Sequence, residues 1–115
     1  MGKSISISLP NGRTWDKKGD AIEHYKAMLA RYADGQRVPN ESEDFSDLKS
    51  LLQVYDAAIS AGKPTKVGVG IAHFERRPDL DHPGHTSCFF VVRTDGSSID
   101  FSTRRALDAA GLVRR

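Results

Sequence analysis

Alternation of apolar and polar residues predicts short strands at the start of the chain. Ile5, Ile7 and Leu9 alternate with polar residues over residues 4–9, which is typical of a strand with one buried face. Pro10-Asn11-Gly12 then favours a tight turn, because asparagine and glycine adopt the backbone angles that such turns require. The chain is therefore expected to fold back into a second strand over residues 13–15.

Two segments with apolar residues every three or four positions predict amphipathic helices. The first is expected to start at an Asp16 cap and to end near Asp34, with Gly35 as its stop. The second is expected to start at Asp44 or Ser46, after a polar loop over residues 36–44. Gly62 and Pro64 should end it. The apolar faces comprise Ala21, Ile22, Tyr25, Met28, Leu29 and Tyr32 in the first helix, and Phe45, Leu48, Leu51, Leu52, Tyr55, Ala58 and Ile59 in the second.

A third strand is expected over residues 66–74, before a polar loop over residues 77–86. Val67, Val69 and Ile71 should share one face of this strand. Gly68 and Gly70 leave the other face bare, so that a neighbouring helix or aromatic residue is expected to pack against the backbone there, with a ligand as the alternative.

The last part of the chain reads as a hairpin followed by a short helix. The strands are expected over residues 87–94 and 98–101, joined at Asp95-Gly96 by a two-residue type I′ turn. Ser102 or Thr103 should cap a helix over residues 104–110, which Gly111 closes. The side chains of this hairpin expected to enter the core are those of Phe90, Val92, Ile99 and Phe101.

This order of elements, β-β-α-α-β-β-β-α, predicts an α+β fold formed by a single domain over residues 1–115. About five short antiparallel strands form one sheet, and the two long helices cover one of its faces, because each amphipathic helix must bury its apolar side. The short C-terminal helix completes the fold.

Composition excludes some classes of protein and leaves others open. No apolar run approaches the length needed to cross a bilayer, and a single cysteine, Cys88, cannot form an intramolecular disulfide. We therefore expect a cytoplasmic monomer with no membrane contact. The net charge is only +2, but residues 1–33 carry +3, residues 34–60 carry −4 and residues 61–115 carry +3. Such a distribution permits a surface that binds polyanions.

Several residues could support catalysis or metal binding, although none forms a complete motif. His82, His85 and Cys88 are competent zinc ligands, but structural zinc sites usually have paired ligands at both ends. A nucleophile such as Cys88 or Ser102 would need one of the histidines as its base, namely His24, His73, His82 or His85. A metal-dependent nuclease would draw on residues of the polar loop, namely Asp79, Asp81, His82 and His85. We expect no cofactor and assign no catalytic residue.

Five arginines form the favoured candidate site. Arg76 and Arg77 end one predicted strand, Arg93 ends the next, and Arg104 and Arg105 open the last helix. If these side chains gather near one end of the sheet, they can hold the phosphates of a nucleic acid. The alternative is an ordinary charged edge in which they pair with Glu75, Asp100 and Asp108.

The stretch CFFVVRTDGSSIDFSTRRAL resembles the signature of the DCL family, named for the plant "defective chloroplasts and leaves" protein. KVGVGIAHFERRP is similar to the family's glycine-containing strand, and TWDKKGDAIEHYKAMLARYADG and DFSDLKSLL are similar to its two helices. The matching positions are Lys66, Gly68, Gly70, Cys88, Phe89, Arg93, Asp95, Gly96, Asp100, Phe101, Ser102 and Arg104. The chain departs from the pattern at Ser87, Thr103 and Ala106, where the family commonly has arginine, tyrosine and cysteine.

The resemblance implies a small domain of bacteria and plastids that is linked in plants to ribosomal RNA processing. Together with the arginines, it favours a free-standing, noncatalytic domain that binds nucleic acid, in the form of RNA, during RNA maturation. A protein-interaction module for polymerase-associated or ribosome-associated partners is the first alternative. A metal-dependent nuclease is the second.

Overall fold

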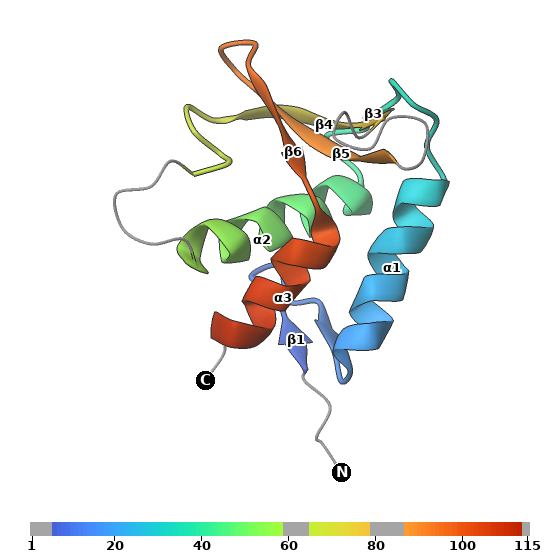
Figure 1. Cartoon of the computed structure of the whole chain (residues 1–115), viewed down its shortest axis with the longest axis vertical. Coiled ribbons are helices and arrows are strands. Elements are labelled where there is room, and N and C mark those ends of the chain that lie inside the picture. The colour runs from blue at the N-terminus through green and yellow to red at the C-terminus, as the bar shows by residue number, and fades with distance from the viewer. Residues whose placement is uncertain (1–5, 59–64, 79–86, 114–115) are drawn as a thin grey trace.

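The computed structural model describes residues 6–58, 65–78 and 87–113, within which the chain forms three helices and six strands (Figure 1). The helices are α1 (Lys18–Ala30), α2 (Glu43–Ala58) and α3 (Thr103–Val113). The strands are β1 (Ile7–Ser8), β2 (Thr14–Trp15), β3 (Arg37–Val38), β4 (Ile71–Pro78), β5 (Ser87–Arg93) and β6 (Ser98–Phe101). The predicted α+β class and order of elements are confirmed, and β3 is an additional short strand in the segment predicted as a loop.

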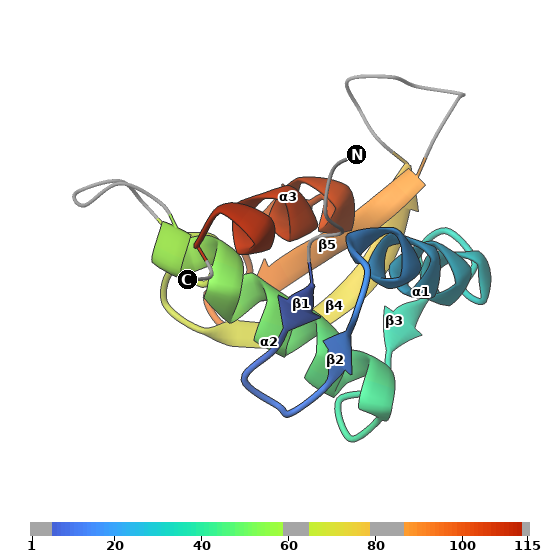
Figure 2. The same ribbon diagram turned by 90° about the horizontal axis from the view of Figure 1, so that it is seen from below.

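The strands divide between two antiparallel sheets rather than one. β1 pairs only with β2, whereas β3, β4, β5 and β6 form a four-stranded sheet in that order. All three helices lie on one side of the larger sheet, and the β1–β2 hairpin lies beyond them (Figures 1 and 2). The helices thus form a layer between the two sheets and also pack on one another, α2 and α3 most extensively.

The core lies between the helices and the inner face of the larger sheet. The predicted helix faces are confirmed, because Ala21, Tyr25 and Met28 of α1 and Leu48, Leu51 and Leu52 of α2 are buried. On the sheet side, Phe74, Phe89, Val91 and Phe101 meet them. Ala58 and Ile59, also expected on the second helix face, have no described side chain.

The two faces of β5 are the reverse of the prediction. Phe89 and Val91 are buried, whereas Phe90 and Val92 are only partly buried and point to the sheet face that carries no helix. Ile99 and Phe101 pair with Val91 and Phe89, so these two predicted core residues do face the helices. Because Phe89, Phe90, Val91 and Val92 are all apolar, alternation alone could not identify the inner face.

Residues 65–70 form an irregular turn, here called the 65–70 turn, and the strand predicted from residue 66 begins only at Ile71. Gly68 has φ +56° and Gly70 has φ +127°, both in the region that side-chain-bearing residues rarely adopt. These two glycines thus bend the chain instead of leaving one face of a strand bare.

The β5–β6 turn also differs from the expected type. Gly96 has φ +88°, but Asp95 does not have a positive φ, which a type I′ turn requires. The backbone N–H of Gly96 donates to the carbonyl of Arg93, and the N–H of Arg93 donates to the carbonyl of Ser97. These bonds define a three-residue loop, a type I turn followed by glycine in a bulge.

The ends of the helices differ from the prediction by a few residues. α1 follows Lys17, which makes no side-chain capping bond, in place of the predicted Asp16 cap. Ser42 caps α2, because its hydroxyl accepts a hydrogen bond from the N–H of Phe45 at 3.1 Å. Ser102 caps α3 as predicted, accepting from the N–H of Arg105 at 3.3 Å. α3 continues through Gly111 to Val113, and the predicted end of α2 at Gly62 and Pro64 lies outside the described residues.

Candidate nucleic-acid interface

Arg76 closes the end of α1. It lies on the inner face of β4, where its register partner is the buried Phe89. Its guanidinium donates to the backbone carbonyls of Leu29 and Tyr32 at 2.9 and 3.0 Å, and to the carboxylate of Asp34 at 2.9 Å. A cation at this end of a helix satisfies carbonyls that have no partner within the helix and complements its dipole. Arg76 therefore has a structural role.

Arg93 holds the 65–70 turn against the sheet. Its Nε donates to the carbonyl of Lys66 at 2.9 Å, and its terminal nitrogens donate to the carbonyl of Thr65 and the hydroxyl of Ser97. The guanidinium lies so close to Gly68 that a Cβ at that glycine would stand 2.8 Å from Arg93 Nε. The close approach to glycine expected from the sequence is thus made by a side chain of the protein itself.

Arg77 lies on the outer face of the sheet and is partly engaged. Its Nε donates to Glu75 at 2.6 Å, another nitrogen donates to the Ser98 hydroxyl at 2.8 Å, and its guanidinium stands 5.1 Å from the centre of the Phe90 ring. His73 pairs with the second oxygen of Glu75 at 2.7 Å. Burial alone would raise the pKa of Glu75, but the hydrogen bonds from Arg77 and His73 lower it.

The five arginines do not gather at one end of the sheet. Arg76 and Arg77 pair with Phe89 and Cys88 at the beginning of β5, whereas Arg93 is at the other end of that strand. Only Arg104 and Arg105, at the start of α3, are both exposed. Arg104 has one long ionic contact, 3.7 Å to Asp108, and the side chain of Arg105 makes no hydrogen bond or ion pair within the part of the chain described. These two arginines therefore remain available to a ligand.

A pocket beside Arg104 adds a cation that the sequence analysis did not single out. The pocket has a volume of about 210 Å³ and lies between α1 and the start of α3. It is lined by Ile22, Lys26, Leu29, Thr103 and Arg104. Lys26 is exposed, and its side chain makes no hydrogen bond or ion pair in the described chain. The sequence feature that could have pointed to Lys26 is its position on the first helix, one turn after Ile22 and one turn before Leu29.

We define the basic groove as this pocket together with Arg105, the exposed residue that follows Arg104 on α3; its members are Ile22, Lys26, Leu29, Thr103, Arg104 and Arg105. α1 and α3 run past one another here, since Lys18 at the start of α1 pairs with Asp108 farther along α3. Asp108 is the acidic residue that contacts Arg104, and it does not line the pocket. The groove thus combines three exposed cations with an apolar floor.

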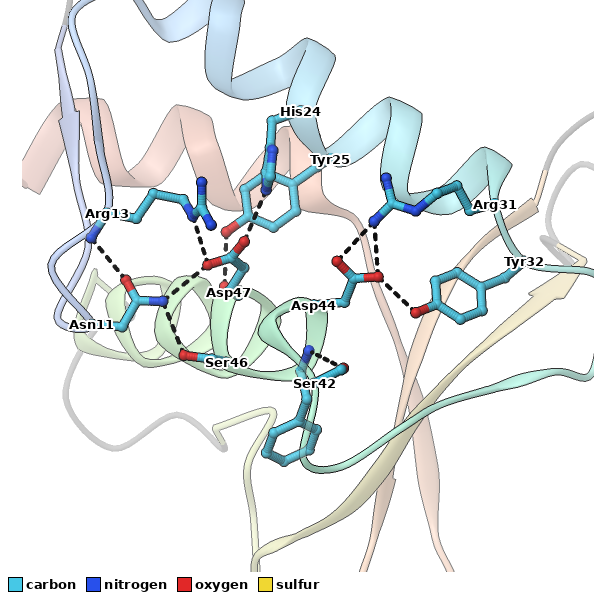
Figure 3. A network of polar contacts seen from close by, with 11 residues as sticks. Asn11, Arg13, His24, Tyr25, Arg31, Tyr32, Ser42, Asp44, Ser46 and Asp47 are labelled. Carbon is cyan, nitrogen blue, oxygen red and sulfur yellow. Dashed lines mark hydrogen bonds and ion pairs between the residues drawn. The ribbon is translucent and has the colours of Figure 1, made fainter.

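A second polar cluster is centred on Asp47 of α2 (Figure 3). Its side chain is only 3% exposed, yet its carboxylate accepts hydrogen bonds from Asn11 Nδ2, Arg13 Nε and His24 Nε2, each at 2.9 Å. The Tyr25 hydroxyl donates to the backbone carbonyl of the same residue at 2.7 Å. Residues of the β1–β2 hairpin and of α1 are thereby fixed to one buried carboxylate on α2. Burial, reinforced by the Asp47 charge, raises the pKa of Tyr25.

This cluster lies beside another pocket, of about 350 Å³, which Asn11, Arg13, Glu43, Ser46 and Asp47 line. Both Asp47 oxygens are already occupied by donors of the protein, so the carboxylate is not free to act on a ligand. Trp15 and Tyr25 pack against His24 with ring centres 5.1 Å away, which fixes the imidazole. We interpret the cluster as the attachment of the hairpin. The sequence signal was an acidic residue within the apolar stripe of the second helix.

A third polar link joins the end of α1 to the start of α2. Arg31 donates to both carboxylate oxygens of Asp44 at 2.8 Å, and the Tyr32 hydroxyl donates to one of them at 2.7 Å (Figure 3). Burial and the bond to Asp44 raise the pKa of Tyr32 to about 12. For Asp44, burial opposes ionisation, but the bonds from Tyr32 and Arg31 prevail and lower its pKa.

The residues proposed for metal binding or nuclease chemistry are largely outside the described part of the chain. These are Asp79, Asp81, His82 and His85. Among the residues that are described, no three histidine, cysteine or acidic side chains stand close enough to hold a metal ion. Cys88 is partly buried on β5, and Ser102 serves as the cap of α3.

The positions that carried the family resemblance mainly build structure. Gly68 and Arg93 make the close contact described above, and Lys66 donates to the carbonyl of Asp100 at 2.7 Å. The side chain of Asp95 accepts from the N–H and the hydroxyl of Ser97 within the β5–β6 loop. Phe89 and Phe101 are buried register partners, and Ser102 caps α3. This sequence signature thus specifies a hairpin, a turn and a helix start.

Residues 26–107 match the model of a family described as "Protein of unknown function (DUF3223)". Because this match spans more than half of the 115 residues, the chain belongs to that family. The solution NMR structure of an uncharacterized protein from Rhodospirillum rubrum is similar to it, with a TM-score of 0.70 and 33% sequence identity. The similarity covers 92% of this chain and 91% of the other. No curated protein matches the chain.

The family match corrects the expectation of a DCL domain. The family found is DUF3223, and nothing shows a DCL domain. The shared residues define local structure, as seen for Gly68, Arg93 and Ser102, so they did not identify a function. The expected link to plastid ribosomal RNA processing consequently loses its basis. In the described chain, no helix has the length and apolar character needed to cross a membrane.

Proposed function

We propose that this protein binds nucleic acid without catalysing a reaction, and that the basic groove is the binding surface. The supporting observation is that Lys26 of α1 and Arg104 of α3 line one pocket, that both are exposed together with the adjacent Arg105, and that Arg104 contacts Asp108 only at 3.7 Å. Phosphates of a polyanion attract such cations, and binding gains from the counterions that the nucleic acid releases. Because the whole sequence has a single cysteine, a reducing compartment such as the cytoplasm suits it.

The proposal differs from the five-arginine surface expected from the sequence. Arg76 and Arg93 use their guanidinium groups on backbone carbonyls of the protein, so binding through them would cost internal hydrogen bonds. Arg104 and Arg105 have no such cost, and Lys26 extends their charge across the groove to α1. The ligand is thus expected to contact the helix layer rather than the outer face of the sheet.

The test is a titration of fluorescently labelled RNA and DNA with the full chain at two salt concentrations. We expect the double variant Arg104→Glu/Arg105→Glu to bind at least about tenfold more weakly, and the slope of log K against log salt to fall by about 0.7 for each lost contact to a single strand. The matched control is Arg37→Glu/Lys49→Glu, which makes the same change in net charge at exposed positions on β3 and α2.

The control should retain the affinity and the salt dependence of the unaltered protein. If both double variants weaken binding equally, binding depends on net charge alone, and the basic groove is not the binding surface. An absence of salt-sensitive binding to every nucleic acid would overturn the proposed function. Capture of a protein partner that survives nuclease treatment would then favour an interaction module.

A further inference from the structure

We infer that the basic groove accepts one unpaired nucleobase, which makes single-stranded nucleic acid the ligand. This inference rests on the proposed function and concerns the pocket at its centre. The volume of about 210 Å³ is smaller than the roughly 300–1,000 Å³ of pockets that enclose drug-sized ligands. It therefore suits one small planar group, while the remainder of the ligand stays outside.

The chemistry of the lining fits a base. Ile22 and Leu29 form an apolar floor and pack against the hydrophobic core, so the floor is fixed. The hydroxyl of Thr103, which also lines the pocket, makes no hydrogen bond within the described chain, which leaves it able to donate to or accept from a base edge. The Arg104 side chain is 66% exposed, and a planar guanidinium with that freedom can stack on a base.

The positions of the cations fit the backbone that such a base would carry. Lys26 and Arg104 stand on opposite sides of the pocket, on α1 and α3, and Arg105 follows Arg104 on the same helix. A base between the two helices would thus bring its flanking phosphates near cations on both. At the N-terminus of α3, the N–H of Arg105 already donates to the Ser102 hydroxyl, so that donor is not free for a phosphate.

A duplex cannot use this pocket without opening. Its bases are stacked and paired, and a base enters a side pocket only after it has left the stack. A single strand has bases that are already free or easily unstacked, and proteins commonly recognise such bases by stacking and edge contacts. A surface that binds only through its charge would bind both the duplex and the single strand, whereas a base pocket prefers the single strand.

The experiment compares four labelled ligands with strands of about ten nucleotides, a length within the usual range for such domains. They are single-stranded RNA, its DNA counterpart, a blunt duplex and an abasic strand, which keeps the phosphates but lacks the bases. We expect the duplex and the abasic strand to bind on the order of tenfold more weakly than the best single strand. The RNA and DNA strands determine which sugar the protein prefers.

The matched variants are Ile22→Trp, which fills the pocket, and Ala27→Trp, which puts the same side chain on an exposed position of α1. Ile22→Trp should lose the preference for bases while keeping salt-sensitive binding, and Ala27→Trp should keep both. If Ile22→Trp fails to fold, the comparison of the four ligands with the unaltered protein decides alone. Equal, salt-sensitive binding of all four would overturn the base pocket and leave the proposed function intact. No binding of any would overturn both.

Discussion

At the scale of single residues, the arginines differ in how many donors the protein itself uses. Arg76 and Arg93 each make three hydrogen bonds, and most of their acceptors are backbone carbonyls. Arg104 has only its contact with Asp108. The sequence located all of these residues at strand or helix ends, but it could not reveal their acceptors. Those acceptors come from segments up to 47 residues away, as with Arg76 and Leu29.

Asp47 is the residue whose removal should cost the fold most through polar contacts. Replacing it with alanine leaves Arg13, His24 and Asn11 without their shared acceptor next to the core. We expect Asp47→Ala to lower the free energy of unfolding by about 3 kcal/mol, the lower end for breaking a buried ion pair, because Arg13 retains access to water. Urea denaturation followed by circular dichroism measures this change.

Gln53→Ala on the same helix provides the matched control for this prediction. Gln53 is exposed, and its replacement should alter the free energy of unfolding by no more than about 0.5 kcal/mol. An equally small loss for Asp47→Ala would show that the hairpin does not depend on this carboxylate.

At the scale of elements, the sequence predicted which segments form helices and hairpins better than which faces they bury. The helix faces were right because apolar and polar residues separate clearly on α1 and α2. The predicted faces of β5 were reversed, because Phe89 to Val92 are all apolar and either alternate pair could be the buried one. Pairing with β4 resolves the choice, since Phe74 is buried and stands opposite Val91.

The turn before β4 was missed for a related reason. Gly68 and Gly70 alternate with valines as they would in a strand, and only their positive φ angles reveal the turn. The sequence analysis named Arg104 and Arg105 of the basic groove but not Lys26, because the groove depends on contacts between distant segments. Sequence alone does not reveal which backbone and side-chain oxygens accept hydrogen bonds from Arg76 and Arg93, or that Lys26 on α1 lines the same pocket as Arg104 on α3.

Gly68 should tolerate no side chain. An alanine there must adopt φ +56° and place its Cβ 2.8 Å from Arg93 Nε, which forces the guanidinium away from its carbonyl acceptors. We expect Gly68→Ala to lower the free energy of unfolding by about 2 kcal/mol. Gly19→Ala provides the comparison, because Gly19 lies in the first turn of α1 with open space around it.

The alanine at position 19 should stabilise the fold by about 0.5 kcal/mol, since it restricts the unfolded chain without strain in the helix. Thermal unfolding of both variants measures the difference. Similar transition temperatures for Gly68→Ala and the unaltered protein would mean that the 65–70 turn carries no strain-sensitive contact with Arg93.

At the scale of the whole molecule, ionised carboxylates connect elements that are distant in sequence. Hydrogen bonds from Ser87 and Arg76 lower the pKa of Asp34, which thereby joins the end of α1 to β4 and β5. Asp44 joins α1 to α2, and Asp47 joins α2 to the β1–β2 hairpin. The layers are therefore attached to one another by charge as well as by apolar packing.

This arrangement predicts a loss of stability in acid. The pKa values of Asp34, Asp44 and Glu75 lie below their ordinary values of 3.8, 3.8 and 4.5 in the folded protein. The stability that they contribute is present above those ordinary values and is lost as the pH falls through the lowered ones. The midpoint of urea unfolding should thus fall steeply below about pH 4.5.

Asp44→Asn should show a smaller fall over the same pH range, because one of the titrating groups is gone. Its stability at neutral pH should also be lower, and the two proteins should converge in strong acid. Urea titrations between neutral pH and strong acid compare them. Parallel curves across the whole range would mean that Asp44 is no more easily ionised in the folded state than in the unfolded state.

The attachment of the hairpin bears on where this domain should be divided. The family match begins at residue 26, inside α1, whereas three donors to Asp47 come from residues before that point. The segment that matches the family model is therefore shorter than the segment that the hydrogen bonds to Asp47 hold together. A recombinant fragment or a gene fusion designed on the family boundary would cut α1 and expose a carboxylate that the intact chain keeps away from water. We therefore expect any fragment that folds by itself to need the N-terminal hairpin.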